Sequence, residues 1–359
     1  MGMVEKKIGV LRGDGIGPEI VPVALKTLSA VGEVYGHKFT FYEASFGAGA
    51  WKTHGTVFPQ EAKKLCYEVD AIIKGPIGDP SIEYLIENPD ERPERGGLLP
   101  LRKMLDAYAG FRPVRLVPKL KDASPLKDAV IGDGIDILMI RELTGGIYFG
   151  RKVECKVNEG ERTDVPLGAR YALDECLYDE HQISRIARVA LREANNRGVP
   201  LHNIHKANVL ATSRLWNIIV SEVAKAEFPD VKVLDYLVDN AAFQLVKDPR
   251  QFKVMLLENM QGDILTDEAG GILGSLGLMP SSCINMEADL NSETGKGCYG
   301  FYEPAHGSAP GIAGQGKSNP YSQIGAVAMM LEMSFNLKKE AGAVWDALAS
   351  VFGAGYRTA

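Results

Sequence analysis

The chain has 359 residues, which is enough for two lobes, because a single hydrophobic core stops growing near about 250 to 300 residues. Its formal net charge of -6 argues against a nucleic-acid partner, whose phosphates require a basic face. The sequence has no apolar run long enough to span a bilayer, and its start lacks the apolar core of a signal peptide. Five cysteines without a C-x-x-C pair predict neither a disulfide framework nor a zinc knuckle, so we expect a cytoplasmic protein.

The N-terminal segment predicts a βα unit. Residues 8–11 form a short apolar run that is typical of a strand, and Gly13-Asp-Gly-Ile-Gly predicts a tight turn after it. Pro18 then predicts the start of a helix whose apolar residues recur at helical spacing as far as Val31. The turn is rich in glycine but lacks the G-x-G-x-x-G spacing of a dinucleotide fingerprint, so we do not predict a Rossmann domain.

Three arginines follow in the next part of the chain. Arg102 comes after Leu98-Leu99-Pro-Leu, and Arg112 precedes a proline. The apolar runs 71–73 and 136–140 are typical of buried strands, and the second delivers Arg141 at its carboxyl end, where ligands of α/β folds collect. A planar guanidinium suits bidentate binding of a carboxylate. Taken singly, however, each arginine fits an ordinary surface ion pair better.

Two amphipathic helices are predicted in the second half of the chain. The first covers 179–196 and is followed by the stop signals Gly198 and Pro200. The second begins at Pro320, with Asn319 as its N-cap, and runs through Leu331. Residues 152–163, before the first helix, are polar and punctuated by glycine and glutamate.

Acidic side chains gather near two predicted strand ends. Asp239 follows the strand-like run 231–238. Asp263 and Asp267 stand four residues apart where an apolar strand runs into a helix, so one helical turn places them on the same face. Two carboxylates so close repel each other unless a cation neutralises them, and their oxygens suit hard ions such as Mg²⁺. A solvated helix face is the simpler alternative for such a pair.

Several motifs, taken together and in this order, resemble one known family. They are Gly13-Asp-Gly-Ile-Gly-Pro-Glu19, Arg141-Glu-Leu-Thr-Gly-Gly-Ile-Tyr148, His205-Lys206-Ala-Asn208-Val209, Val238-Asp239-Asn240, Glu258-Asn-Met-Gln-Gly-Asp263-Ile-Leu-Thr-Asp267 and His306-Gly-Ser-Ala-Pro-Gly-Ile-Ala-Gly with Asn319. They cover nearly the whole chain. The chain resembles the isocitrate/isopropylmalate dehydrogenase family of metal-dependent β-decarboxylating dehydrogenases, and within it the isopropylmalate branch.

The resemblance implies an α/β fold of two lobes that is not a Rossmann fold, with a large mixed sheet flanked by helices. It places the first, cofactor-side lobe at 1–107 plus 273–359. The second lobe, at 108–272, would carry the metal and substrate sites and the dimer contact. An arm near 151–168 would pair with the same arm of a second copy.

The resemblance also assigns roles in the site. Arg102, Arg112 and Arg141 would hold the substrate carboxylates, Tyr148 and Lys206 would be catalytic, and Asp239, Asp263 and Asp267 would bind Mg²⁺ or Mn²⁺. Lys206, Asn208 and Asp239 would reach the site from a second copy, and Asn208 and Asp239 would also contact the substrate. An active homodimer with shared sites is therefore expected.

An apolar trio points to the substrate side chain. Leu98 and Leu99 on this chain and Val209 of the second copy suit an alkyl group, with Glu94 lining the pocket near the nicotinamide. We therefore expect a 3-alkylmalate, and isopropylmalate first. Arg95 keeps isocitrate and homoisocitrate open, and Gln261, where the family usually has phenylalanine, keeps benzylmalate open. A non-catalytic regulatory subunit is the rival of another class, although the tyrosine, lysine and aspartates are all present.

The resemblance places the cofactor along one late loop. Its members are Glu303, His306, Gly307, Ser308, Ala309, Pro310, Gly311, Ile312 and Asn319. Family members that use NAD normally have an aspartate where Gly311 stands, and Lys317 could tolerate the 2′-phosphate of NADP. NAD is nevertheless expected, because the lysine and tyrosine of typical NADP enzymes are absent at 311 and 312.

Overall fold

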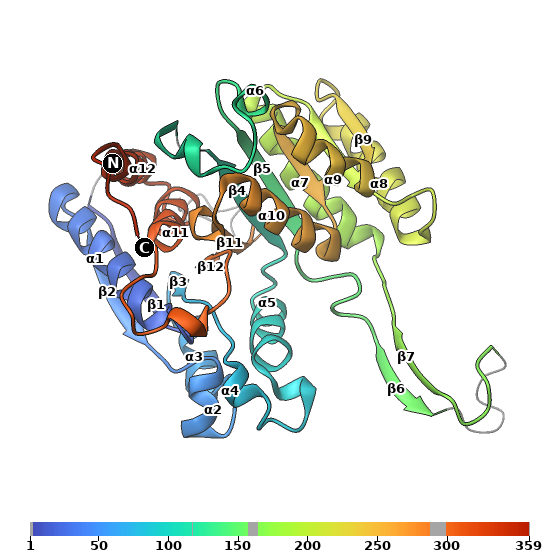
Figure 1. The fold of residues 1–359 in the computed structure, drawn as a ribbon, viewed down its shortest axis with the longest axis horizontal. Coiled ribbons are helices and arrows are strands. Elements are labelled where there is room, and N and C mark those ends of the chain that lie inside the picture. Colours follow the sequence, from blue (N-terminus) through green and yellow to red (C-terminus); the bar gives the residue numbers. More distant parts are fainter. Residues whose placement is uncertain (1–2, 117, 157–163, 288–298, 359) are drawn as a thin grey trace.

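A computed structural model describes residues 3–116, 118–156, 164–287 and 299–358 (Figure 1). Within these residues, ten strands form one mixed sheet in the order β2-β1-β3-β12-β11-β4-β5-β10-β8-β9. Their bounds are β1 Glu5–Leu11, β2 Lys38–Glu43, β3 Ala71–Lys74, β4 Ala109–Arg115, β5 Asp136–Glu142, β8 Leu201–His205, β9 Val233–Leu237, β10 Val254–Leu257, β11 Pro280–Asn285 and β12 Tyr299–Pro304. The predicted large mixed sheet flanked by helices is confirmed.

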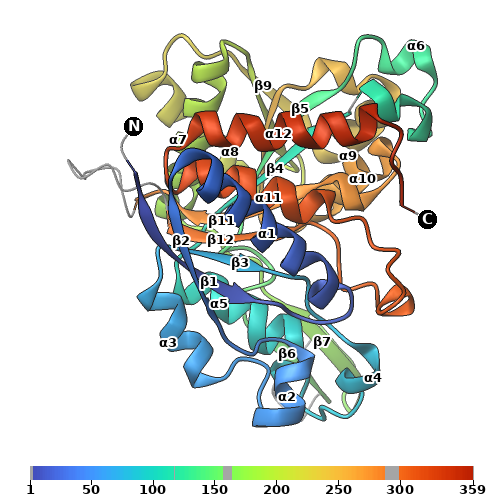
Figure 2. The same cartoon turned by 90° about the vertical axis from the view of Figure 1, so that its left-hand side faces the viewer.

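Helices cover both faces of this sheet. Their bounds are α1 Gly17–Tyr35, α2 Ala48–His54, α3 Gln60–Glu68, α4 Pro80–Glu83, α5 Leu99–Met104, α6 Asp128–Ile131, α7 Glu180–Arg197, α8 Ala211–Glu227, α9 Val238–Lys247, α10 Asn259–Leu273, α11 Tyr321–Met333 and α12 Lys338–Gly353. Figure 2 shows α1, α11 and α12 lying side by side over one half of the sheet, and α11 contacts both β11 and β12. None of the helices in the described ranges has the length and apolar character needed to cross a membrane.

The direction of the strands decides where the functional segments meet. Strands β5, β10, β8 and β9 are parallel neighbours, so their carboxyl ends lie at one edge of the sheet. Arg141 lies near the end of β5, α10 follows β10, Lys206 follows β8, and α9 with Asp239 follows β9. Segments that are more than a hundred residues apart in sequence therefore come together at this edge, where α/β folds bind ligands.

The antiparallel middle of the sheet aligns a second set of side chains. In the register, Gly110 on β4 pairs with Arg141 on one side and with Cys283 on the other. Ser281, two residues before Cys283, pairs with Glu303 on β12. Directly paired residues and residues two apart share a face of a sheet. The register therefore brings the C-terminal strand β12 and the arginine-bearing strands β4 and β5 onto one face.

Residues on either side of 157–163 form a two-stranded ribbon where the sequence predicts an arm near 151–168. Strands β6 Lys152–Lys156 and β7 Arg170–Asp174 pair in an antiparallel ribbon that extends away from the rest of the molecule (Figure 1). The remaining part of the predicted arm, 157–163, lies outside the described residues. Pairing of this arm with a second copy stays a prediction, as do the lobe boundaries at 107, 108, 272 and 273.

The predicted helices and strands agree closely with the structure. Helix α7 occupies the predicted range within one residue, because Asp179 and Gln182 form a capping box and Gly198 ends the helix at a φ of 62°. The second predicted helix was placed one residue too early, since α11 begins at Tyr321. The N-cap was likewise predicted one residue too early, since Pro320 is the N-cap, although Asn319 Oδ1 accepts a hydrogen bond from the Tyr321 N–H at 3.0 Å.

Candidate active site

A cleft of about 460 Å³ lies beside the middle of the sheet and is lined by segments from both predicted lobes. The N-terminal part contributes Glu94, Leu98, Leu99 and Arg102, and the C-terminal part contributes Glu303, His306 and Gly307. The middle of the chain contributes Arg112, Arg141, Tyr148 and Asp263. The structure therefore brings together eleven of the residues that the sequence singled out, although they span more than two hundred positions.

Three buried guanidinium groups define the charge of this cleft. Arg102, Arg112 and Arg141 are only 4%, 7% and 1% exposed. Burial, and then the positive charges of Arg112 and Arg102, lower the pKa of Arg141 to about 10. Cations that destabilise one another in this way favour an anion between them. The Nε atom of Arg102 is buried and has no hydrogen-bond partner among the described residues, which leaves a donor for such an anion.

The carboxylates of α10 balance part of this charge. Asp263 pairs with the Arg141 guanidinium, and its Oδ2 accepts a hydrogen bond from the Tyr148 hydroxyl at 2.8 Å. Asp267, one turn later, lies 3.6 Å from Arg112. Burial opposes ionisation of Asp263, but Arg141 and Arg112 outweigh it and hold its pKa below the usual range. Burial and the neighbouring Asp263 raise the pKa of Asp267, which is the repulsion that a cation between them would relieve.

Tyr148 is held in a protonated state by its surroundings. Burial and the negative charge of Asp263 raise its pKa to about 12. The hydroxyl therefore keeps its proton at neutral pH and can donate it. It lies in the cleft with Arg141, whose guanidinium carbon is 5.8 Å from the centre of the tyrosine ring.

Lys206 and Asp239 form a separate pair at the same edge of the sheet. The Lys206 Nζ donates to Asp239 Oδ1 at 2.6 Å, and neither residue lines the cleft. Asn208 and Val209 beside them are exposed. In the described parts of the chain, no three acidic, histidine or cysteine side chains lie close enough to hold a metal. One copy therefore supplies Asp263 and Asp267 but does not place Asp239 with them.

The late loop that the sequence assigns to the cofactor divides into two parts. Residues from Glu303 to Gly307 line the cleft. Ser308 is buried and donates its hydroxyl to the Gly78 carbonyl at 2.5 Å, so this side chain holds the loop against the segment that follows β3. Pro310–Ile312 form an exposed turn, and the space around Gly311 is open. The cofactor roles of these residues, like the other predicted site roles, stay predictions.

Two residues with a place in the site were missed from the sequence. Lys74, at the end of β3, is 1% exposed, lines the cleft, and donates to Glu303 at 2.5 Å. Asn259, at the start of α10, is fully buried and binds Arg141 through its side chain. The only sequence signal for Lys74 was a charged residue ending an apolar strand. Asn259 lies in the same motif as Asp263 and Asp267, but the sequence reasoning assigned roles to the two aspartates alone.

The geometry agrees with the relatives of this chain. A family model described as isocitrate/isopropylmalate dehydrogenase matches residues 7–359. A 3-isopropylmalate dehydrogenase of Geobacter sulfurreducens is 46% identical over 98% of this chain and 91% of that protein, and one of Carboxydothermus hydrogenoformans is 45% identical over 98% and 88%. The solved isocitrate dehydrogenase of Methylococcus capsulatus superposes with a TM-score of 0.80 at 28% identity, covering 98% of this chain and 92% of that chain. The chain belongs to the isocitrate/isopropylmalate dehydrogenase family.

Proposed function

We propose that the protein oxidises 3-isopropylmalate with NAD and decarboxylates the product to 4-methyl-2-oxopentanoate, a step of leucine biosynthesis. The observation that carries this proposal is a set of three buried arginines that line the same cleft as two leucines. A malate brings two carboxylates to the arginines, and its alkyl group would lie against Leu98 and Leu99. The names of relatives that are about 45% identical over nearly the whole chain support the same substrate.

Charge pairing in the cleft favours a dicarboxylate over a tricarboxylate. Three further cations line the cleft besides the three arginines, namely Lys74, Arg95 and Lys152. Lys74 Nζ is bound to Glu303 at 2.5 Å and to the Gly75 carbonyl at 2.9 Å, Lys152 Nζ donates to the Ile147 carbonyl at 2.8 Å, and Arg95 is paired with Asp90. None of the three is left without a counterion or acceptor, whereas isocitrate or homoisocitrate would need one more cation.

The chain's own side chains divide the chemistry between them. Arg102, Arg112 and Arg141 would bind the two carboxylates and orient the diacid, and bound NAD would supply the acceptor for the hydride from its hydroxyl-bearing carbon. Lys206 of the partner subunit would take the hydroxyl proton. Loss of CO₂ from the β-carboxylate leaves an enolate, and Tyr148 would return a proton to its carbon. The raised pKa of Tyr148, about 12, keeps that proton available.

Asp263 and Asp267 fit a divalent ion because both offer hard carboxylate oxygens on one helix face. They would hold Mg²⁺ or Mn²⁺ with Asp239 of the partner subunit, and the ion would acidify the hydroxyl and stabilise negative charge on that oxygen. The late loop that begins at Glu303 would bind NAD, and its residues from Glu303 to Gly307 line the cleft.

A second copy is part of this proposal. Large apolar side chains on α8, α9, α10 and the segment before α8 are exposed in a single chain, namely Val209, Leu210, Ile218, Phe243, Val246 and Ile264. Exposed apolar surface of this extent is typical of a protein interface. Lys206 precedes Val209 in the chain, and Asp239 is on α9 with Phe243 and Val246. A second copy that covers these apolar side chains would therefore receive both residues at its own cleft.

The test is a kinetic panel on the purified protein with Mg²⁺ or Mn²⁺. Reduced nicotinamide formation is followed with isopropylmalate, benzylmalate, isocitrate and homoisocitrate, each with NAD and with NADP. We expect the highest kcat/KM with isopropylmalate and NAD. Faster turnover of a tricarboxylate would refute the substrate, a preference for NADP would refute the cofactor, and no turnover of any of the four would leave the regulatory-subunit alternative.

A further inference from the structure

The side chain of Asn259 joins two parts of the cleft that lie far apart in the sequence. It is fully buried at the first position of α10. Its Oδ1 accepts hydrogen bonds from Arg141 Nε at 3.1 Å and Arg141 Nη2 at 2.8 Å. Its Nδ2 donates to the Gly145 carbonyl at 2.9 Å, in the loop that leads to Tyr148. One carboxamide therefore binds both the guanidinium and the tyrosine loop.

The hydrogen bonds to Asn259 set the direction of Arg141. A guanidinium has two edges that can bind a carboxylate, and Asn259 occupies the edge formed by Nε and Nη2. The remaining nitrogen, Nη1, is directed to Asp263. Arg141 therefore presents its Nη end to the cleft in a single orientation. Because the side chain is already ordered, it loses little conformational entropy when a ligand binds.

The loop that carries Tyr148 is held from both sides. The Glu142 carboxylate accepts hydrogen bonds from the Thr144 N–H at 2.9 Å and the Gly145 N–H at 2.7 Å. Asn259 holds the carbonyl of the same Gly145. Gly146 follows with a φ of 73°, a left-handed conformation that other residues rarely adopt. The turn is thus fixed just before Tyr148, which leaves the tyrosine hydroxyl directed at Asp263.

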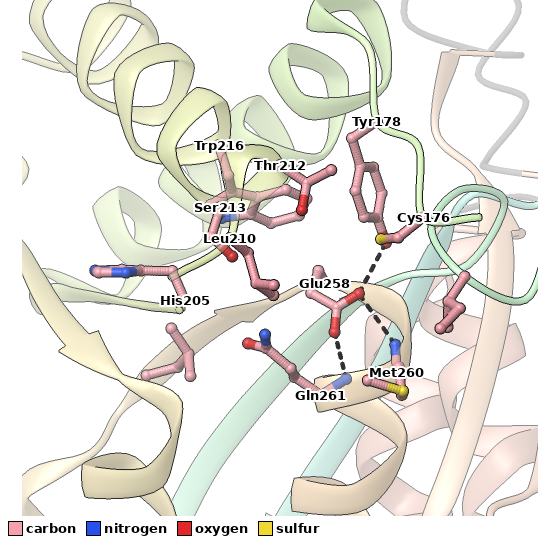
Figure 3. Close-up of a pocket in the computed structure, with 12 residues that line it drawn as sticks. Cys176, Tyr178, His205, Leu210, Thr212, Ser213, Trp216, Glu258, Met260 and Gln261 are labelled. Atoms are coloured by element: carbon pink, nitrogen blue, oxygen red, sulfur yellow. Dashed lines mark hydrogen bonds between the residues drawn. The ribbon is translucent and has the colours of Figure 1, made fainter. Parts of the chain in front are cut away.

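Capping of α10 does not explain Asn259. The carboxylate of Glu258 caps this helix by accepting hydrogen bonds from the N–H groups of Met260 and Gln261, and the Tyr178 hydroxyl bonds to the same carboxylate (Figure 3). The backbone N–H of Asn259 donates to that hydroxyl at 2.9 Å. The first turn of the helix is therefore satisfied without the Asn259 side chain, whose polar atoms are free for Arg141 and Gly145.

We propose that Asn259 is a positioning residue that holds Arg141 and Tyr148 in register with each other. Its oxygen orients the arginine for substrate binding, and its amide nitrogen orients the tyrosine for proton return. This inference rests on the proposed function. Each half of the carboxamide has its own task, so the two tasks can be separated by substitution.

The test compares Asn259→Ala and Asn259→Asp with the intact protein. Asn259→Ala removes both contacts, so kcat should fall by about a hundredfold, as expected for a small misplacement of reacting groups, and KM for isopropylmalate should rise. Asn259→Asp keeps an acceptor for Arg141 but places an oxygen against the Gly145 carbonyl. It should therefore keep KM near that of the intact protein while kcat falls.

Hydrogen–deuterium exchange supplies a readout that does not need turnover. Asn259→Ala should raise exchange in 143–150 and leave the rest of α10 unchanged. The matched control is Gln251→Ala, which removes a carboxamide bound to Tyr236 at 3.0 Å and to the Asp248 carbonyl at 2.9 Å, outside the cleft. The control should lower the melting temperature but change neither kcat, KM nor exchange in 143–150.

Three results would overturn the inference. They are unchanged kcat and KM in both Asn259 variants, equal losses in the Gln251 control, or increased exchange limited to α10. If Asn259→Ala does not fold, Asn259→Asp decides by its split between kcat and KM. If the intact protein turns over no substrate, the proposed function fails, and the exchange in 143–150 alone decides the positioning role.

Discussion

At the residue scale, one buried ion pair illustrates how the cleft is held together. Lys74 and Glu303 lie 2.5 Å apart with exposed side-chain fractions of 1% and 8%, and Arg102 is 3.9 Å from the same carboxylate. Burial alone would raise the pKa of Glu303, but Lys74 and then Arg102 hold it below the usual range. The carboxylate is therefore charged at neutral pH and compensates two cations.

Removing one member of this pair should lower the free energy of unfolding far more than removing both. Glu303→Gln leaves Lys74 buried without a counterion and should lower the free energy of unfolding by roughly 3 to 5 kcal/mol. Lys74→Met combined with Glu303→Gln should recover most of that loss. Urea unfolding of the two single variants and the double variant measures this. Losses that simply add in the double variant would contradict a coupled pair.

The same pair predicts a dependence of stability on pH. A carboxylate whose pKa is lowered by folding stabilises the folded state above its unfolded pKa, near about 4.3 for glutamate. That stabilisation is lost as the pH falls through the lower, folded pKa. The intact protein should therefore lose stability in acid more steeply than Glu303→Gln. Parallel losses for the two proteins would show that Glu303 is not responsible.

Sequence reasoning found the charged residues of the cleft but not their partners. The spacing of Asp263 and Asp267 predicts that both lie on one face of a helix, and the structure places that face beside Arg112. The partners of Asn259 and Lys74 depend instead on β5 and β12, which lie 118 and 229 positions away in the sequence. No local pattern specifies such contacts, because they follow from the order of the strands.

At the element scale, the close approach of α10 to β5 depends on one glycine. A Cβ on Gly262 would come within 2.7 Å of the Arg141 Cγ and 3.1 Å of its Cβ. Both Arg141 atoms lie near the backbone, so the arginine cannot avoid the added Cβ by moving only the far end of its side chain. The helix can therefore carry Asp263 to Arg141 only because position 262 has no side chain.

Gly262→Ala should displace Arg141 and reduce kcat/KM by tenfold or more, as one misplaced ligand of the substrate would do. Kinetics with isopropylmalate measure this. The control is Gly342→Ala in α12, where nothing lies within 4 Å of the added Cβ. The control should keep full activity and gain up to about 1 kcal/mol of stability from its higher helix propensity. Full activity of Gly262→Ala would contradict the close approach.

Capping signals made the helices easier to predict than the arm. The bounds of α7 followed from Asp179 and Gly198, which act through local hydrogen bonds and backbone conformation. The polar segment beginning at Lys152 gave no alternation of apolar residues, so its two strands were not predicted. They pair with each other as a ribbon rather than with the main sheet, which explains the missing pattern.

At the scale of the whole molecule, the C-terminal segment supplies two central strands of the sheet. Strands β11 and β12 lie between β3 and β4, so a late part of the chain separates two early strands. This order cannot be read from strand patterns alone, although the family resemblance supplied the general architecture. It explains why Glu303 and the loop after it line one cleft together with Arg102 and Lys74.

Catalysis in this account requires residues from two copies. Tyr148 lines the cleft of its own chain, whereas Lys206 is paired with Asp239 outside that cleft. A chain with Lys206→Met and a chain with Tyr148→Phe would each spoil every site of their own homodimers. In a heterodimer, however, one site would combine the intact Tyr148 of one chain with the intact Lys206 of the other.

The most direct test is therefore the activity of that heterodimer, purified after co-expression of two differently tagged chains. The account predicts that both homodimers are inactive with isopropylmalate and NAD. The heterodimer should show about half of the intact dimer's rate, because one of its two sites is complete. A heterodimer as inactive as its parents would contradict a site shared between two copies.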